Sequence, residues 1–273
     1  MNFRFKQTFK MLALAGLISS LAACGGGGGT HVRLKVSGVA ATGYAIPGAN
    51  VSVQCVSGRG VATTEADGSY TITINNGQGP CIVTVQTNQM LVNGVVTTVA
   101  PYTLTSITPP ATLVDGIAVT TANVSPLSTA VVAALVAAKG AATVADLVNE
   151  NSTAIPTAAD LLAASTTVIT TINQTLLDNG ASPDQLLPAN LGLDVIGKTT
   201  FVASTTDTPS DDIIDQVLDL LNAKSLITED NTLDPVIQET ITTEVEDSVD
   251  PNANPGNPNP QPTGGQSTGG NSV

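Results

Sequence analysis

Few side chains in this sequence have the types and spacing that catalysis requires. The chain contains one histidine, His31, so a serine nucleophile would have no second imidazole to serve as its base. Acids stand in adjacent pairs at Asp211-Asp212 and Glu246-Asp247. Such pairs could hold calcium or exchange protons, but no EF-hand spacing surrounds them, and acids near a helix start also stabilise the helix dipole. We therefore expect no catalytic, metal or cofactor site; a calcium site or a carboxylate enzyme is the open alternative.

The charge and composition of the chain exclude one class of partner. The 273 residues include 22 acids and nine bases, and 13 of the acids follow residue 206. A chain this acidic is not suited to binding nucleic acid or to lying on an anionic membrane surface. Aromatic residues make up 3% of the chain and tryptophan is absent, so Val, Ile, Leu and Ala must build the core.

The N-terminal segment has the layout of an export signal. Residues 1–10 carry three bases and no acid, and a 13-residue uncharged stretch follows, too short to span a bilayer. It ends in Leu-Ala-Ala-Cys24, before five glycines. This segment resembles the lipobox of bacterial lipoproteins. The resemblance implies a signal peptide over residues 1–23, acylation of Cys24, and a lipidated Cys and Gly tether over residues 24–30. A plain signal peptide with an unrelated cysteine is the alternative.

The same resemblance implies a location. In many Gram-negative bacteria, Asp after the lipid-bearing cysteine retains a lipoprotein at the inner membrane; here Gly25 occupies that position. We therefore expect a lipid-anchored protein of the bacterial outer membrane, on either of its faces. Several acyl chains on Cys24 would hold the chain without further membrane contact. The mature chain would keep six bases and 22 acids, a net charge of −16.

Acylation of Cys24 would leave two cysteines, Cys55 and Cys81. Each is in phase with the apolar side of its own alternating segment. Export implies an oxidising compartment, in which two thiols tend to pair. We predict a Cys55–Cys81 disulfide, with two buried free thiols as the alternative; a redox role is disfavoured because no Cys-x-x-Cys is present.

Residues 31–122 alternate with a period of two. Apolar residues recur at every second position in short segments separated by turn pairs such as Pro47-Gly48 and Asp67-Gly68, which indicates half-buried antiparallel strands in a β-sandwich. Residues 36–74, with Ile-Pro-Gly-Ala before one strand and Asp-Gly-Ser-Tyr before another, resemble the carboxypeptidase regulatory-like domain. The resemblance implies a prealbumin- or transthyretin-like sandwich that serves as a non-catalytic appendage.

Residues 123–249 change to a helical period. The pattern predicts helices from Pro126 to about residue 136, over 158–178, as a short turn at 182–185, over 210–224 and over 234–248, with one strand near 199–202. The fold class is therefore α+β: an N-terminal antiparallel sandwich followed by a small C-terminal helical bundle. Residues 250–273 are rich in Pro, Asn and Gly, which predicts a disordered tail.

These patterns favour a non-catalytic cell-envelope lipoprotein with a structural, adhesive or ligand-contact role. Its partners would be the membrane, reached through the lipid anchor, and a glycan or protein ligand, with no nucleic acid. The alternative is a surface module that binds carbohydrate or peptide, which would be favoured if Tyr44, Arg59 and Tyr102 met on one exposed surface.

Overall fold

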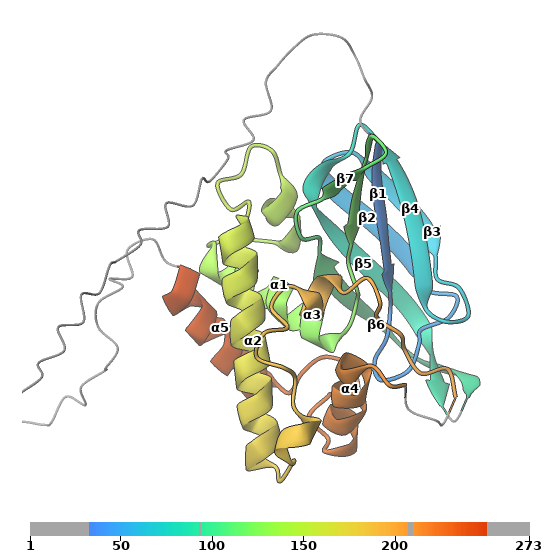
Figure 1. Ribbon diagram of the computed structural model, residues 1–273, viewed down its shortest axis with the longest axis vertical. Coiled ribbons are helices and arrows are strands. Elements are labelled where there is room, and N and C mark those ends of the chain that lie inside the picture. The colour runs from blue at the N-terminus through green and yellow to red at the C-terminus, as the bar shows by residue number, and fades with distance from the viewer. Residues whose placement is uncertain (1–32, 93, 207–209, 250–273) are drawn as a thin grey trace, which may run out of the picture. The chain divides into compact units, whose positions relative to one another are not determined.

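The computed structural model describes residues 33–92, 94–206 and 210–249. The expected signal peptide (1–23), Cys24 and its tether, His31 and the tail (250–273) lie outside the described residues. The fold is α+β, with two four-stranded sheets followed by five α-helices (Figure 1).

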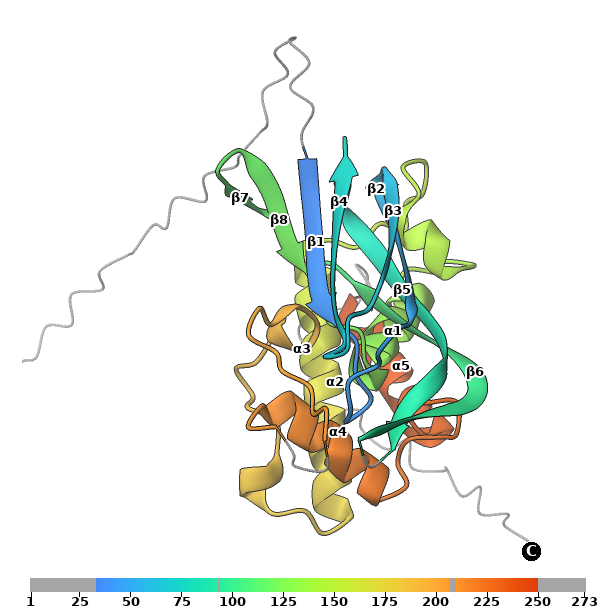
Figure 2. The same cartoon turned by 90° about the vertical axis from the view of Figure 1, so that its right-hand side faces the viewer.

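The strands form two sheets of four. One sheet has the order β4-β1-β8-β7 and the other β3-β2-β5-β6. All neighbours are antiparallel except β1 and β8, which run parallel from Leu34 beside Ala118. The expected sandwich is therefore not purely antiparallel, because the chain returns from β6 through the β7–β8 hairpin and lays β8 alongside β1 (Figure 2). The strands are β1 (Arg33–Val39), β2 (Asn50–Ser57), β3 (Arg59–Thr63), β4 (Ser69–Asn75), β5 (Gln78–Val92), β6 (Val95–Ile107), β7 (Thr112–Val114) and β8 (Ile117–Thr121).

Alternation along the strands builds the core between the sheets. In β2 every second residue is buried, and the outward residues are exposed. The same holds for β1 and β4, as the period-two pattern predicted. Each large aliphatic side chain buried this way contributes about 1.5–3 kcal/mol. This core is made by β1, β2, β4, β5 and β6, and it includes Leu34, Val36, Val51, Val53, Cys55, Tyr70, Ile72, Ile74, Cys81, Val83, Val85 and Leu104.

The helices pack around α1, which is buried along most of its length. Helix α1 contacts α2, α5 and strand β6, so it lies between the sheet and the other helices. Its start follows the expected signals, since Ser125 caps it and Pro126 is its first residue. The helices are α1 (Pro126–Ala138), α2 (Ala158–Asp178), α3 (Asp194–Gly197), α4 (Ile213–Ala223) and α5 (Pro235–Val249), with 3₁₀ turns η1 (Val144–Val148) and η2 (Pro183–Gln185).

Helix α1 closes part of the edge of strand β6. The Thr105 amide donates to Thr129 Oγ1 at 3.0 Å, and Ser128 Oγ donates to the Thr105 carbonyl at 2.8 Å. The Thr129 hydroxyl in turn donates a hydrogen bond to the Ser125 carbonyl at 2.8 Å. Both backbone groups of Thr105 are therefore satisfied by helix side chains, which protects this stretch of an edge strand from pairing elsewhere. Ile82 and Ile107 of the same sheet belong to the helical core.

Two expectations for the C-terminal half were wrong. Residues 199–202 form no strand: Phe201 is buried among the helices, and only Ser204 makes an isolated bridge, to Tyr44. Helix α4 begins at Ile213, with Asp212 rather than Ser210 as its N-cap. Three consecutive residues, Ser210 to Asp212, can each cap a helix, and the ion pair of Asp212 with Lys198 selects the last of them.

Candidate functional site

Cys55 and Cys81 form a disulfide, which confirms the predicted pairing. The two residues lie directly opposite each other on β2 and β5, and both are buried in the sandwich core. The bond closes a sequence separation of 26 residues. Because the sulfurs face the core, the bond acts as a structural crosslink between two neighbouring strands.

The three residues proposed for a carbohydrate surface do not meet on one. Tyr102 is 5% exposed, and its hydroxyl donates to the Gln89 carbonyl at 3.1 Å. Arg59 is exposed at the β2–β3 turn, whereas Tyr44 lies beside Ser204, beyond the other end of β2. No stacking platform of the kind that favours sugar binding is formed by these residues.

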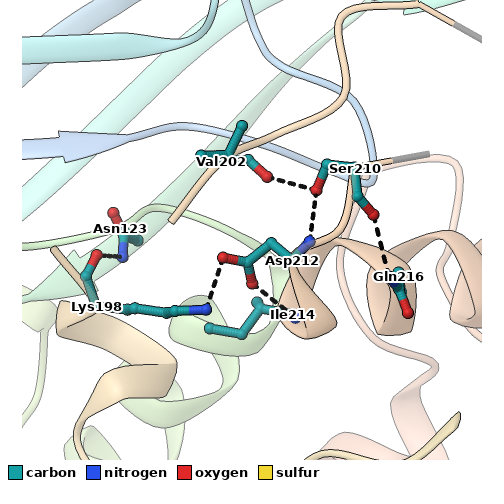
Figure 3. Close-up of polar contacts among 7 residues, drawn as sticks. All are labelled: Asn123, Lys198, Val202, Ser210, Asp212, Ile214 and Gln216. Carbon is teal, nitrogen blue, oxygen red and sulfur yellow. Dashed lines mark hydrogen bonds and ion pairs between the residues drawn. The ribbon is translucent and has the colours of Figure 1, made fainter. Parts of the chain in front are cut away.

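The first acidic pair is part of the scaffold. Asp212 Oδ2 accepts from Lys198 Nζ at 2.7 Å, and its Oδ1 accepts from the Ile214 amide at 3.0 Å (Figure 3). The Lys198 carbonyl in turn accepts from Asn123, which also receives the Val39 amide. One oxygen of Asp212 therefore caps α4, and the other pairs with Lys198, which links α4 to the end of the sandwich.

The second acidic pair, Glu246-Asp247, lies exposed on the last turn of α5. Within residues 33–92, 94–206 and 210–249, no group of three or more His, Cys, Asp or Glu side chains is placed to hold a metal ion.

A further pair of carboxylates was missed from the sequence. Asp215 and Asp219 stand one turn apart on α4, and Asp215 is fully buried. Asp215 Oδ2 accepts from the Ser204 amide at 3.0 Å and from Ser204 Oγ at 2.5 Å. Burial raises the pKa of Asp215 despite these hydrogen bonds. The burial of Asp215 could have been predicted from the sequence, since this acid falls within the apolar face of an amphipathic helix, next to Ile214.

Ionisation of Asp219 is unfavourable in the folded chain. Burial, and then the charge of Asp215, raise the pKa of Asp219 to about 6. The backbone at Gly43 passes directly over its Oδ1, which leaves no room for a side chain there. Because the pKa is raised in the folded state, the folded chain binds this proton more tightly than the unfolded chain. The contribution of Asp219 to stability is therefore present below about pH 4 and is lost as the pH rises to about 6 and above.

An apolar cavity lies between the sandwich and the start of α2. It has a volume of about 330 Å³ and an apolar lining in which four prolines take part. Its two threonine hydroxyls are already engaged: Thr108 Oγ1 accepts from the Cys81 amide, and Thr120 Oγ1 donates to the Pro109 carbonyl. The lining is therefore mostly apolar, and it is formed by Leu34, Gly79, Pro80, Thr108, Pro109, Pro110, Ala111, Thr120, Pro156, Ala158 and Leu161.

A second, polar cleft lies between the β2–β3 turn and η1. Arg59 lines it together with two acids, Asp146 and Glu150. Asp146 Oδ2 also accepts from the Thr143 amide and hydroxyl, at 2.8 and 3.0 Å, so it caps η1. The cleft presents charges of both signs and no nucleophile paired with a base.

The chain matches no known family model, no curated protein and no solved structure. None of the helices in the described ranges is long and apolar enough to cross a bilayer.

Proposed function

We propose that this protein is a non-catalytic lipoprotein of the bacterial outer membrane, anchored through acylated Cys24, in which a transthyretin-like sandwich and its helices form a structural or ligand-contact body. The observation that carries the proposal is the order of the N-terminal residues: a basic start, an uncharged stretch of 13 residues, Leu-Ala-Ala-Cys24 and five glycines. Several acyl chains, carried by a diacylglycerol on the thiol and by the amino group of the same cysteine, anchor a protein stably, and a glycine run gives a flexible spacer.

Two further observations support the proposal. The buried Cys55–Cys81 disulfide suits an oxidising compartment. The two adjacent acid pairs also have structural explanations. Asp212 is paired with Lys198, and Glu246 lies on an exposed helix end.

Fractionation of cells that express Cys24→Ser tests the anchor. We expect wild-type protein in the outer-membrane fraction and Cys24→Ser in the soluble envelope fraction or unprocessed. Gly25→Asp is the matched variant, because it keeps the lipid and changes only the sorting residue; it should move the protein to the inner membrane. Equal membrane association of wild type and Cys24→Ser would refute the proposal.

A second candidate function is binding of an apolar peptide side chain in the proline-lined cavity. The cavity volume of about 330 Å³ and its engaged hydroxyls favour an aliphatic or proline side chain over a sugar. Ala158→Phe would fill the cavity, whereas Ala159→Phe, at the next exposed position, would not. A peptide library should yield ligands that Ala158→Phe abolishes and Ala159→Phe retains. Hits on a glycan array that both variants retain would count against this candidate.

A further inference from the structure

We infer that the end of the sandwich from which the tether leaves rests on the membrane surface, with the tip of the β7–β8 hairpin, Leu113 and Val114, entering the headgroup layer. This inference rests on the proposed function, because the lipid on Cys24 brings that end to the bilayer. It adds an orientation and a contact surface that the anchor alone does not require.

Register places the hairpin tip beside the start of the body. Leu34 pairs with Ala118, and Val114 pairs with Ile117 across the turn at Asp115 and Gly116. Both views show the β7–β8 turn at the end where β1 begins (Figures 1 and 2). Eight residues lie between Cys24 and Arg33, so the nine Cα–Cα steps from one to the other span at most about 32 Å. The lipid therefore cannot move far from this end.

The hairpin tip is apolar and unusually exposed. Leu113 is 74% exposed and Val114 is 52% exposed. They belong to a run, residues 110–116, in which every residue is exposed and Asp115 is the one charge. Two adjacent aliphatic side chains on a protruding turn can enter the boundary between headgroups and acyl chains.

The charges at this end make contact with an anionic surface possible. The elements that meet here are the β7–β8 hairpin, the start of β1, the β2–β3 and β4–β5 turns and η1; Gly58 of the β2–β3 turn lies against Gly77, and Arg33 pairs with Asn75. Their bases are Arg33, Lys35 and Arg59, half of the six in the mature chain, and their acids are Asp115, Asp146 and Glu150. This end is therefore close to neutral, although the mature chain carries a charge of −16. An anionic membrane therefore repels this end only weakly.

The opposite end of the sandwich offers a matched comparison. The β5–β6 hairpin carries two adjacent exposed valines, Val95 at 64% and Val96 at 50%. Strand β5 starts near the tether end, with Gln78 paired to Ser57, and runs 15 residues to Val92. The same kind of apolar tip thus exists far from the tether, which separates the effect of position from that of hydrophobicity.

Single tryptophans can report which tip meets the membrane, because the chain has none of its own. The full lipidated protein carrying Leu113→Trp or Val95→Trp is reconstituted into vesicles of phosphatidylethanolamine and phosphatidylglycerol, with and without brominated acyl chains. We expect bromolipid to quench Leu113→Trp at least roughly twofold more than Val95→Trp, with a blue-shifted emission and reduced access to acrylamide. Val114→Trp repeats the measurement at the neighbouring position.

Each other outcome overturns the inference in a recognisable way. Equal bromolipid quenching of the two variants on vesicle-bound protein refutes the contact and leaves the anchor intact. Protection of Leu113→Trp from acrylamide without bromolipid quenching assigns the tip to a second copy of the chain. If the wild-type chain floats with vesicles no better than Cys24→Ser, the proposed anchor fails and the orientation fails with it.

Discussion

Removal of the Thr129 hydroxyl tests how the helices are joined to the sheet. In the folded chain, Thr129 Oγ1 accepts the Thr105 amide at 3.0 Å, on the edge of β6 that faces α1. Thr129→Val keeps the shape of the side chain and has a similar helix propensity, so its main effect is to leave this amide without its acceptor. An unsatisfied, partly buried amide costs about 1–3 kcal/mol. We expect the free energy of unfolding to fall by that amount.

The assay is urea-induced unfolding of the oxidised chain, followed by far-ultraviolet circular dichroism, with amide hydrogen exchange at Thr105 as a local readout. Thr129→Ser keeps the hydroxyl and should lose less than about 1 kcal/mol. Thr166→Val is the matched control, because the Thr166 hydroxyl is exposed and bonds only to the Leu162 carbonyl within α2. If Thr129→Val destabilises no more than Thr166→Val, and exchange at Thr105 is unchanged, the helix does not seal this edge as described.

Three further substitutions have defined outcomes. Replacing Cys55 and Cys81 together by alanine should lower the free energy of unfolding by about 3–4 kcal/mol, measured by urea titration, because the crosslink closes a separation of 26 residues; an unchanged midpoint would contradict this. Asp219→Asn should raise the free energy of unfolding by about 1 kcal/mol near pH 7.5 and should remove the part of its pH dependence between about pH 4 and 6 that comes from Asp219. A raised pKa of two units corresponds to about 3 kcal/mol, and solvent screening of this half-exposed group reduces that value. A wild-type pH profile in the variant would refute the assignment. Gly38→Ala should cost at least about 2 kcal/mol, because its methyl group would collide with the Ala122 carbonyl; thermal unfolding at the wild-type temperature would exclude that collision.

Much of the local structure could be predicted because it is encoded by short-range chemistry. The inward residues of β2 and β4 follow from strict alternation, and the starts of α1 and α2 follow from Ser125 and Thr157, which accept hydrogen bonds from the first turn. The disulfide could be predicted because both cysteines share the buried phase of their strands.

What could not be predicted depends on contacts between distant segments. The parallel pairing of β1 with β8 could not be predicted locally, since β1 alternates as an antiparallel strand does and the five residues of β8 show no alternation of burial. The segment after Lys198 has strand-forming residues, but Phe201 packs in the helical core and only Ser204 forms a bridge, to Tyr44. The start of α4 was misplaced because the ion pair between Lys198 and Asp212 decides among three possible caps.

The candidate sites divide in the same way. The anchor at Cys24 is a prediction that the sequence makes alone, whereas the proline-lined cavity gathers Leu34, Pro109 and Pro156 from three separate parts of the chain. The helix pattern places Asp215 on the apolar face of α4, whereas the contacts of Asp215 with Ser204 and of Asp219 with Gly43 join distant segments and cannot be predicted from that pattern.

The most direct test of the central claim is the intact mass of the protein purified from membranes, before and after reduction. We expect a chain that begins at Cys24 and carries diacylglycerol and an amide-linked acyl chain, and that gains about 2 Da on reduction as the Cys55–Cys81 disulfide opens. A lipid-free chain, or one that begins at any other residue, would contradict the account.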